Sequence, residues 1–148
     1  MRWVTSVACL ATAVIASVLA ATNGASARNM EMLQQLASGV EGYYQSRDRC
    51  YYHPSIDPVI EEADAILGEQ YGHLWETTKE QVALGLQGAL HMRRTFEPGT
   101  TPPGDQALCQ TVSIFVGYVL VASLSITGPV PEVIEEMTRL SNGDGRVK

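Results

Sequence analysis

Apolar residues recur at helical spacing in the first part of the chain after residue 28. Between residues 29 and 49 they are Leu33, Leu36, Val40, Tyr43 and Tyr44, with polar residues between them. Side chains three and four positions apart share one face of a helix, so this pattern predicts a first amphipathic helix. Gly39 and Gly42 lower the helix propensity of the segment, because glycine has the most conformational freedom to lose on folding.

The clearest periodicity runs from Asp57 to Phe96. Asp57 is the expected cap of a helix that continues with Pro58, a residue type favoured at the first helical position. The apolar positions then hold a constant phase on a helical wheel, and they include Ile60, Leu67, Tyr71, Leu74, Val82, Ala89, Met92 and Phe96. This phase predicts one long helix, or two nearly collinear helices broken near Gly72. At about 1.5 Å per residue, one straight helix would be longer than a typical small domain is wide, so a bend at residues 68–72 is also expected.

Residues 106–131 contain no charged side chain. Residues 106–126 are therefore predicted to form a central apolar helix, which follows a proline- and glycine-rich break at residues 97–104. A short last helix is expected at residues 131–140, and residues 144–148 are expected to fray. These helical segments predict an all-α fold, a small helical bundle of about four helices.

A membrane span is the alternative interpretation of residues 108–126, since this segment is long enough to cross a bilayer. Ser113 and Gly117 have the four-residue spacing that lets helices approach closely in lipid. Polar residues interrupt the segment, however, and no Lys or Arg follows it closely as a stop signal. The pattern favours a buried core helix and leaves a membrane-tethered ectodomain as a second interpretation.

Residues 1–27 have the organisation of a cleaved secretory signal peptide. Arg2 gives a short basic start, an uncharged run rich in Ala and Val follows, and residues 25–27 are Ala, Ser and Ala. Signal peptidase recognises small residues at such positions, so cleavage is predicted before Arg28. Residues 28–148 are then expected to form a single α-helical domain that is secreted or periplasmic.

Two cysteines follow the predicted cleavage site, Cys50 and Cys109. In an exported chain, an isolated pair of cysteines is expected to form one disulfide. This disulfide would join the end of the first predicted helix to the start of the central apolar helix. The entropy of closing such a long loop predicts a stabilisation of about 4 kcal/mol.

The net charge excludes some classes of partner. After cleavage the chain would carry 9 basic and 16 acidic residues, a net charge of −7, and no basic patch. Nucleic acids and anionic membrane surfaces are therefore not expected as partners, because both are recognised through clustered Lys and Arg.

Acidic residues and histidines form a stripe opposite the apolar face of the segment from Asp57 to Phe96. Glu69, His73 and Glu76 are four and three residues apart and could together bind a divalent metal ion. A metalloprotein or enzyme that uses them is a third interpretation. A solvated helix carries its charged residues on this same face, so the pattern favours an ordinary surface, and no cofactor is expected.

Aromatic side chains gather in the first half of the chain. The set that could form a ligand pocket or a partner surface is Tyr43, Tyr44, Tyr51, Tyr52, His53 and Trp75. Packing in the core and around the disulfide is the simpler explanation for such residues. No motif of a catalytic nucleophile appears in the chain. The sequence thus predicts an exported, non-catalytic α-helical protein that binds another protein or a small apolar molecule.

Overall fold

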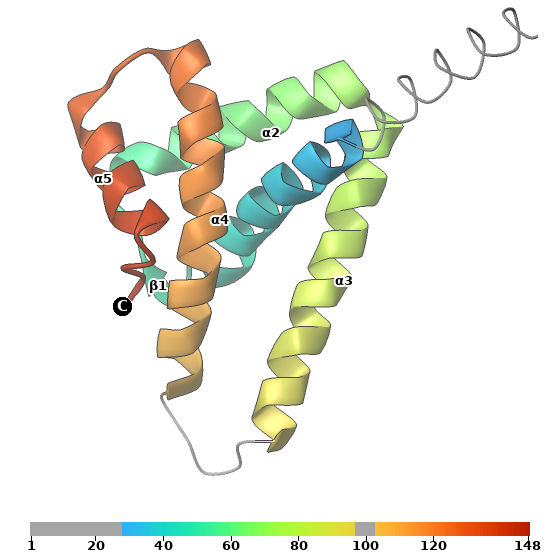
Figure 1. Cartoon of the computed structure of the whole chain (residues 1–148), viewed down its shortest axis with the longest axis vertical. Coiled ribbons are helices and arrows are strands. Elements are labelled where there is room, and N and C mark those ends of the chain that lie inside the picture. Colours follow the sequence, from blue (N-terminus) through green and yellow to red (C-terminus); the bar gives the residue numbers. More distant parts are fainter. Residues whose placement is uncertain (1–27, 97–102) are drawn as a thin grey trace, which may run out of the picture. The chain divides into compact units, whose positions relative to one another are not determined.

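A break at Gly72 divides the long periodic segment into two helices. The computed structural model describes residues 28–96 and 103–148, and in it α2 covers Asp57–Tyr71 and α3 covers His73–Phe96. Gly72 adopts φ 57° and ψ −128°, a conformation that glycine tolerates and other residues rarely adopt. The helices leave Gly72 in different directions, so the expected break near Gly72 is confirmed and has the form of a bend rather than of a nearly collinear pair (Figure 1).

The other described elements complete a small all-α fold, as predicted. They are a first helix at residues 28–46, β1 (Cys50–Tyr51), η1 (Pro54–Ile56), α4 (Pro103–Thr127), α5 (Pro131–Ser141) and β2 (Arg146–Val147). The described residues thus contain five α-helices and one small two-stranded sheet. The predicted signal peptide and most of the predicted break at 97–104 lie outside the described residues.

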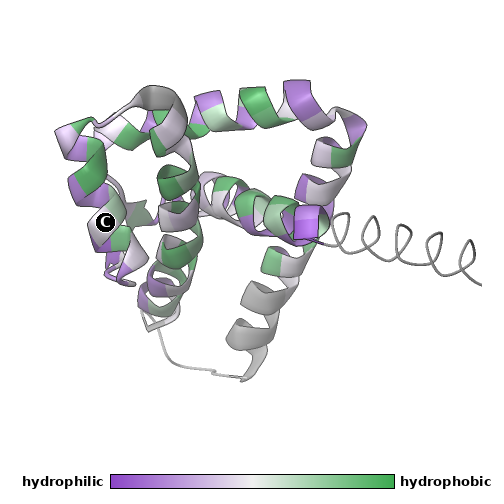
Figure 2. Ribbon diagram, turned by 45° about the horizontal axis from the view of Figure 1, so that its top comes forward, coloured by the Kyte–Doolittle hydropathy of each residue, from purple (hydrophilic) through white to green (hydrophobic). Residues whose placement is uncertain are grey.

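The α4 helix packs against the first helix at two glycines. A Cβ atom on Gly39 would collide with the side chain of Val119 and with the backbone carbonyl of Phe115, and one on Gly42 would lie 2.9 Å from Val112. These glycines lower helix propensity, but they let the two helix backbones approach closely. The face of α4 turned towards this crossing is apolar and buried, and it includes Leu108, Val112, Val116, Val119 and Leu120 (Figure 2).

A second side of α4 packs against α5, again at a glycine. A Cβ atom on Gly117 would lie 2.6 Å from the Oγ of Ser141. By length and composition, Gly104–Ser125 would be able to cross a membrane, but half of its most apolar window is buried inside the protein. The helix is not enclosed on all sides, because the side chains of Ile114 and Val121 remain about half exposed.

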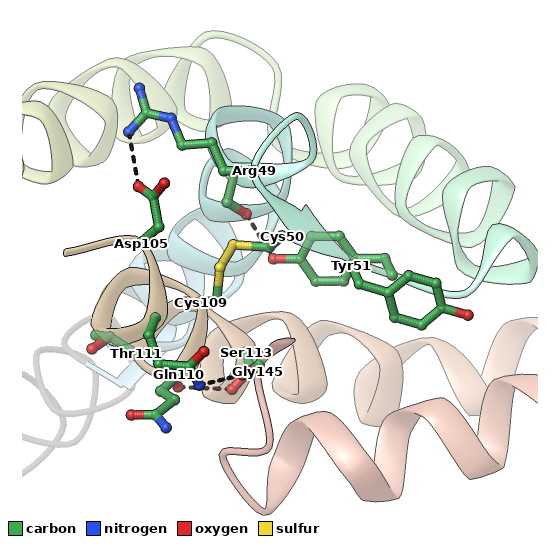
Figure 3. Close-up of a disulfide and its surroundings, with 12 residues drawn as sticks. Arg49, Cys50, Tyr51, Asp105, Cys109, Gln110, Thr111, Ser113 and Gly145 are labelled. Carbon is green, nitrogen blue, oxygen red and sulfur yellow. Dashed lines mark hydrogen bonds and ion pairs between the residues drawn. A yellow bond between two sulfur atoms is a disulfide. The ribbon is translucent and has the colours of Figure 1, made fainter. Parts of the chain in front are cut away.

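The predicted disulfide between Cys50 and Cys109 is confirmed. It joins β1 to the first turns of α4 with a Cα–Cα distance of 5.5 Å, and both cysteines are 1% exposed (Figure 3). Gly145 lies directly over the backbone carbonyl of Cys109, where a Cβ atom would collide with it. The C-terminal segment therefore covers the disulfide.

The prediction that residues 144–148 fray is wrong. Within them, β2 pairs antiparallel with β1, so that Cys50 lies opposite Val147 and Tyr51 lies opposite Arg146. The backbone N–H of Lys148 also donates to the carbonyl of Arg49 at 2.9 Å. Backbone pairing therefore anchors the end of the chain.

Candidate functional site

The short strand after the first helix separates the aromatic cluster into two groups. Successive side chains of a strand point to opposite faces. Tyr51 therefore faces α5, where the guanidinium of Arg139 lies 5.7 Å from its ring centroid. Cys50 and Tyr52 face the other way, and they line a separate cavity of about 380 Å³.

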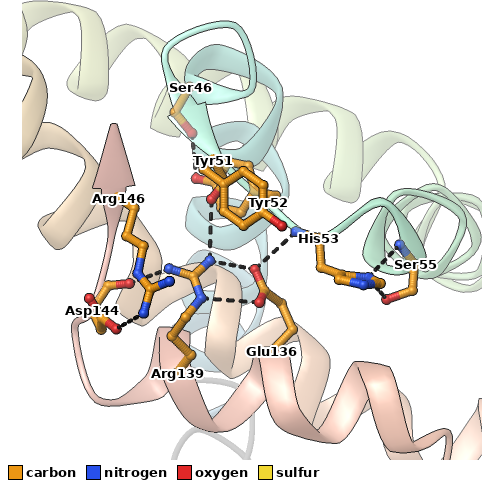
Figure 4. A network of polar contacts seen from close by, with 9 residues as sticks. All are labelled: Ser46, Tyr51, Tyr52, His53, Ser55, Glu136, Arg139, Asp144 and Arg146. Carbon is orange, nitrogen blue, oxygen red and sulfur yellow. Dashed lines mark hydrogen bonds and ion pairs between the residues drawn. The ribbon is translucent and has the colours of Figure 1, made fainter. Parts of the chain in front are cut away.

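A buried ion pair on α5 connects this helix to the strand. The Glu136 side chain is 7% exposed and accepts hydrogen bonds from Arg139 Nε and from the backbone N–H of His53, both at 3.1 Å. Arg139 also donates to the backbone carbonyls of Tyr51 and Asp144 (Figure 4). The pair thus holds α5, the strand and the C-terminal segment together.

The contacts of Glu136 keep it ionised in spite of its burial. Burial raises the pKa of Glu136, but hydrogen bonds from Arg139 and from the His53 N–H lower it by more than burial raises it. The net shift of the pKa is therefore downward. The hydrogen bond to Glu136 in turn raises the pKa of Arg139. Each charge is therefore satisfied by the other.

A cavity of about 470 Å³ opens beside this ion pair, and we call it the α5 pocket. It is lined by Tyr51, His53, Glu132, Glu135, Glu136, Arg139 and Arg146. Arg146 forms an ion pair with Asp144 at 3.0 Å, and Arg139 forms the ion pair with Glu136 described above. Glu132 and Glu135 are exposed and have no ion-pair partner among the residues that the structure describes. The pocket therefore carries unneutralised negative charge at its rim.

The second cavity is built from tyrosines that already have partners. The rings of Tyr43 and Tyr52 lie 5.0 Å apart, and the Tyr52 hydroxyl lies 2.6 Å from the Ser46 hydroxyl. Tyr43 is buried and donates to the carboxylate of Asp57. Asp57 is the first residue of α2, whereas the N-cap position is taken by Ile56. The expected cap therefore forms a tertiary contact with Tyr43 instead.

Trp75 belongs to the core rather than to a partner surface. It is fully buried, and its Nε1–H donates to Asp64 at 2.8 Å. Asp64 also accepts from Lys79 at 2.8 Å and, at 3.5 Å, from Tyr44. Burial together with the nearby carboxylates raises the pKa of Tyr44 to about 12. The inclusion of Trp75 in the candidate surface is therefore corrected, because no ligand reaches a side chain without exposed surface.

The proposed metal ligands fall on both sides of the Gly72 break. Glu69 lies near the end of α2, whereas His73 and Glu76 lie in the first turn of α3. Nε2 of His73 is 3.3 Å from the Thr77 hydroxyl, and Glu76 pairs with Lys79 at 3.3 Å. No group of three or more His, Cys, Asp or Glu side chains in the described ranges is placed to hold a metal ion.

The α5 residues of the pocket are the part that sequence reasoning missed. Tyr51 and His53 are among the candidates from the sequence, but Glu136 is not. A signal was present, since Glu136 shares a helical face with the apolar Val133, Met137 and Leu140. A carboxylate at such a position is buried and needs a partner, which Arg139 supplies from the next turn.

Comparison with known proteins identifies no relative of this chain. No protein family matches this chain, and no curated protein or solved structure is significantly similar to it.

Proposed function

We propose that this chain is an exported, non-catalytic binding protein, and that the α5 pocket receives a basic side chain of a protein partner. The proposal rests on two exposed carboxylates, Glu132 and Glu135, which line the pocket together with Tyr51. Neither carboxylate has an ion-pair partner among the described residues. A Lys or Arg side chain would pair with these carboxylates and could stack on Tyr51, which is 42% exposed.

The composition of the pocket supports a polar partner over a small apolar one. Sites for apolar molecules are lined mainly by apolar side chains, with few polar groups. The α5 pocket has the reverse composition, with five of its seven lining residues being Glu or Arg. The net charge of −6 for the whole chain would also steer a basic partner towards it.

Export is supported by the disulfide and by the features of residues 1–27. A buried disulfide between two distant elements is typical of oxidising compartments such as the periplasm or the exterior of the cell. The basic start, the uncharged run and the small residues before Arg28 are typical of a signal peptide that directs export to such a compartment.

A blocked tetra-arginine peptide is a suitable probe of the pocket. We would titrate it into the ¹⁵N-labelled protein and follow the backbone amide signals by NMR. The proposal predicts the largest shifts at residues 51–53 and in α5. Shifts concentrated on the acidic start of α2, or spread evenly over the acidic surface, would contradict the proposal.

A further inference from the structure

An exposed stripe runs along the side of α4 that faces neither the first helix nor α5. Its members are separated by three, four, three and four residues, and they are Thr111, Ile114, Tyr118, Val121 and Ser125. Ile114 is 53% exposed, Tyr118 38% and Val121 49%. This spacing is the one by which one helix packs along another, and we call the set the α4 stripe.

The hydroxyl groups at the two ends of the stripe already have hydrogen-bond partners. The hydroxyl of Thr111 donates to the carbonyl of Ala107 at 2.8 Å, and that of Ser125 donates to the carbonyl of Ala122 at 3.1 Å. Both hydroxyls are therefore satisfied within α4 itself. No charged residue lies between Asp105 and Glu132, so a partner that covers the stripe would leave no buried charge.

The order of side chains in the stripe is the same in both directions. Tyr118 lies at the centre, a β-branched aliphatic residue lies on either side of it, and a hydroxyl residue lies at each end. In an antiparallel pair of such helices with a two-fold axis at Tyr118, Ile114 meets Val121 and Thr111 meets Ser125 of the other copy. Such a self-complementary patch is what a symmetric dimer requires.

We propose that the α4 stripe is the interface of a homodimer in which two α4 helices pack antiparallel across Tyr118. The antiparallel arrangement also places opposite ends of the two helix dipoles side by side. An uncharged stripe suits a second uncharged stripe, whereas the acidic surface elsewhere keeps the two copies apart at other faces. A lipid bilayer fits less well, because half of the apolar window of α4 is buried against its own chain.

Association can be measured by sedimentation equilibrium on the protein exported by an expression host. The wild type should be a dimer, and added salt should strengthen it by screening the net negative charge of each copy. Tyr118→Glu places like charges together at the two-fold axis, and it should raise the dissociation constant by about 100-fold or more. The matched control is Leu84→Glu, at a 69% exposed position on α3, and it should leave the dimer intact.

Cysteine cross-linking tests the antiparallel register independently of the charged variant. Tyr118→Cys should form a disulfide between its own two copies. Thr111→Cys should not, because its two copies would lie about 20 Å apart along the helices, yet it should link to Ser125→Cys when the two variants are mixed. A monomeric wild type at all concentrations would overturn the proposal. So would self-linking of Thr111→Cys, dimers unaffected by Tyr118→Glu, or a monomer that partitions into phosphatidylcholine vesicles.

Discussion

Gly39 lies against the backbone carbonyl of Phe115, at the point where the first helix crosses α4. There is no room for a Cβ atom at this position, because it would overlap both that carbonyl and the side chain of Val119. A carbonyl inside a helix cannot move aside without breaking the backbone hydrogen bond that it accepts. The crossing therefore depends on glycine, even though glycine weakens the helix that carries it.

Gly39→Ala is expected to destabilise the fold by about 1–3 kcal/mol, the cost of overpacking a core contact. The control is Gly85→Ala in α3, where a Cβ atom would meet nothing within 4 Å. Alanine is the better helix former by about 0.8–1 kcal/mol, so this variant should be more stable than the wild type. Urea unfolding followed by circular dichroism measures both, and equal effects from the two substitutions would contradict the proposed close crossing.

Cys109→Ser is expected to lower the stability of the oxidised protein by about 4 kcal/mol, because the disulfide joins residues 59 positions apart and restricts the unfolded chain. The reduced wild type and the reduced variant should melt at nearly the same temperature. Thermal unfolding with and without a reductant provides the comparison. A variant that melts together with the oxidised wild type would remove the disulfide from the account of stability.

Glu136 should make stability depend on pH in the acidic range. Its pKa in the folded protein lies below the ordinary value of 4.5, so the unfolded chain takes up the proton first as the pH falls. The stabilisation by this carboxylate is therefore complete well above pH 4.5 and is lost as the pH falls through the folded pKa.

Glu136→Gln tests this dependence, since it removes the titrating group while nearly preserving its shape. The variant should be less stable at neutral pH by about 1–3 kcal/mol, and it should lose less further stability on acidification than the wild type. Glu135→Gln, on the exposed side of the same helix, should keep the pH dependence of the wild type. If Glu136→Gln loses stability on acidification as steeply as the wild type does, other carboxylates determine the pH dependence of stability.

The exported protein should have the mass of residues 28–148 less two hydrogen atoms. Signal peptidase would remove residues 1–27, and the disulfide would account for the two hydrogens. Intact-mass spectrometry under denaturing, non-reducing conditions gives the answer. A chain that retains residues 1–27, or one with free thiols, would contradict the proposed export.

The features that could be predicted from the sequence are those determined by local pattern. The helices could be predicted because apolar spacing is a property of neighbouring residues. The disulfide could be predicted because the two cysteines after residue 27 allow only one intramolecular pair. The position of the bend at Gly72 could be predicted, because one straight helix of this length would be longer than a small domain is wide. Its angle could not, since the apolar phase continues across the break and the positive φ of Gly72 turns the chain. The pairing of Val147 with Cys50 was missed because strands of two residues leave no alternating pattern.

Only the part of the candidate site that depends on neighbouring residues could be predicted from the sequence. Tyr51 and His53 stood out as aromatic neighbours of a cysteine, but their partner Glu136 lies 83 positions from His53. Contacts over such distances depend on how the helices pack, which the spacing within one helix does not specify. Trp75 was misassigned because the sequence does not show whether an indole N–H finds an acceptor within the fold, as that of Trp75 does at Asp64.

The most direct test of the proposed function compares the affinity of the tetra-arginine peptide for two double variants. Glu132→Gln with Glu135→Gln neutralises the rim of the α5 pocket, whereas Glu61→Gln with Glu62→Gln removes the same charge from exposed positions on α2. The proposal predicts that calorimetry detects at least about a tenfold loss of affinity in the first variant, equivalent to about 1.4 kcal/mol, and little change in the second. Equal losses in both variants, or no loss in the first, would contradict binding at the α5 pocket.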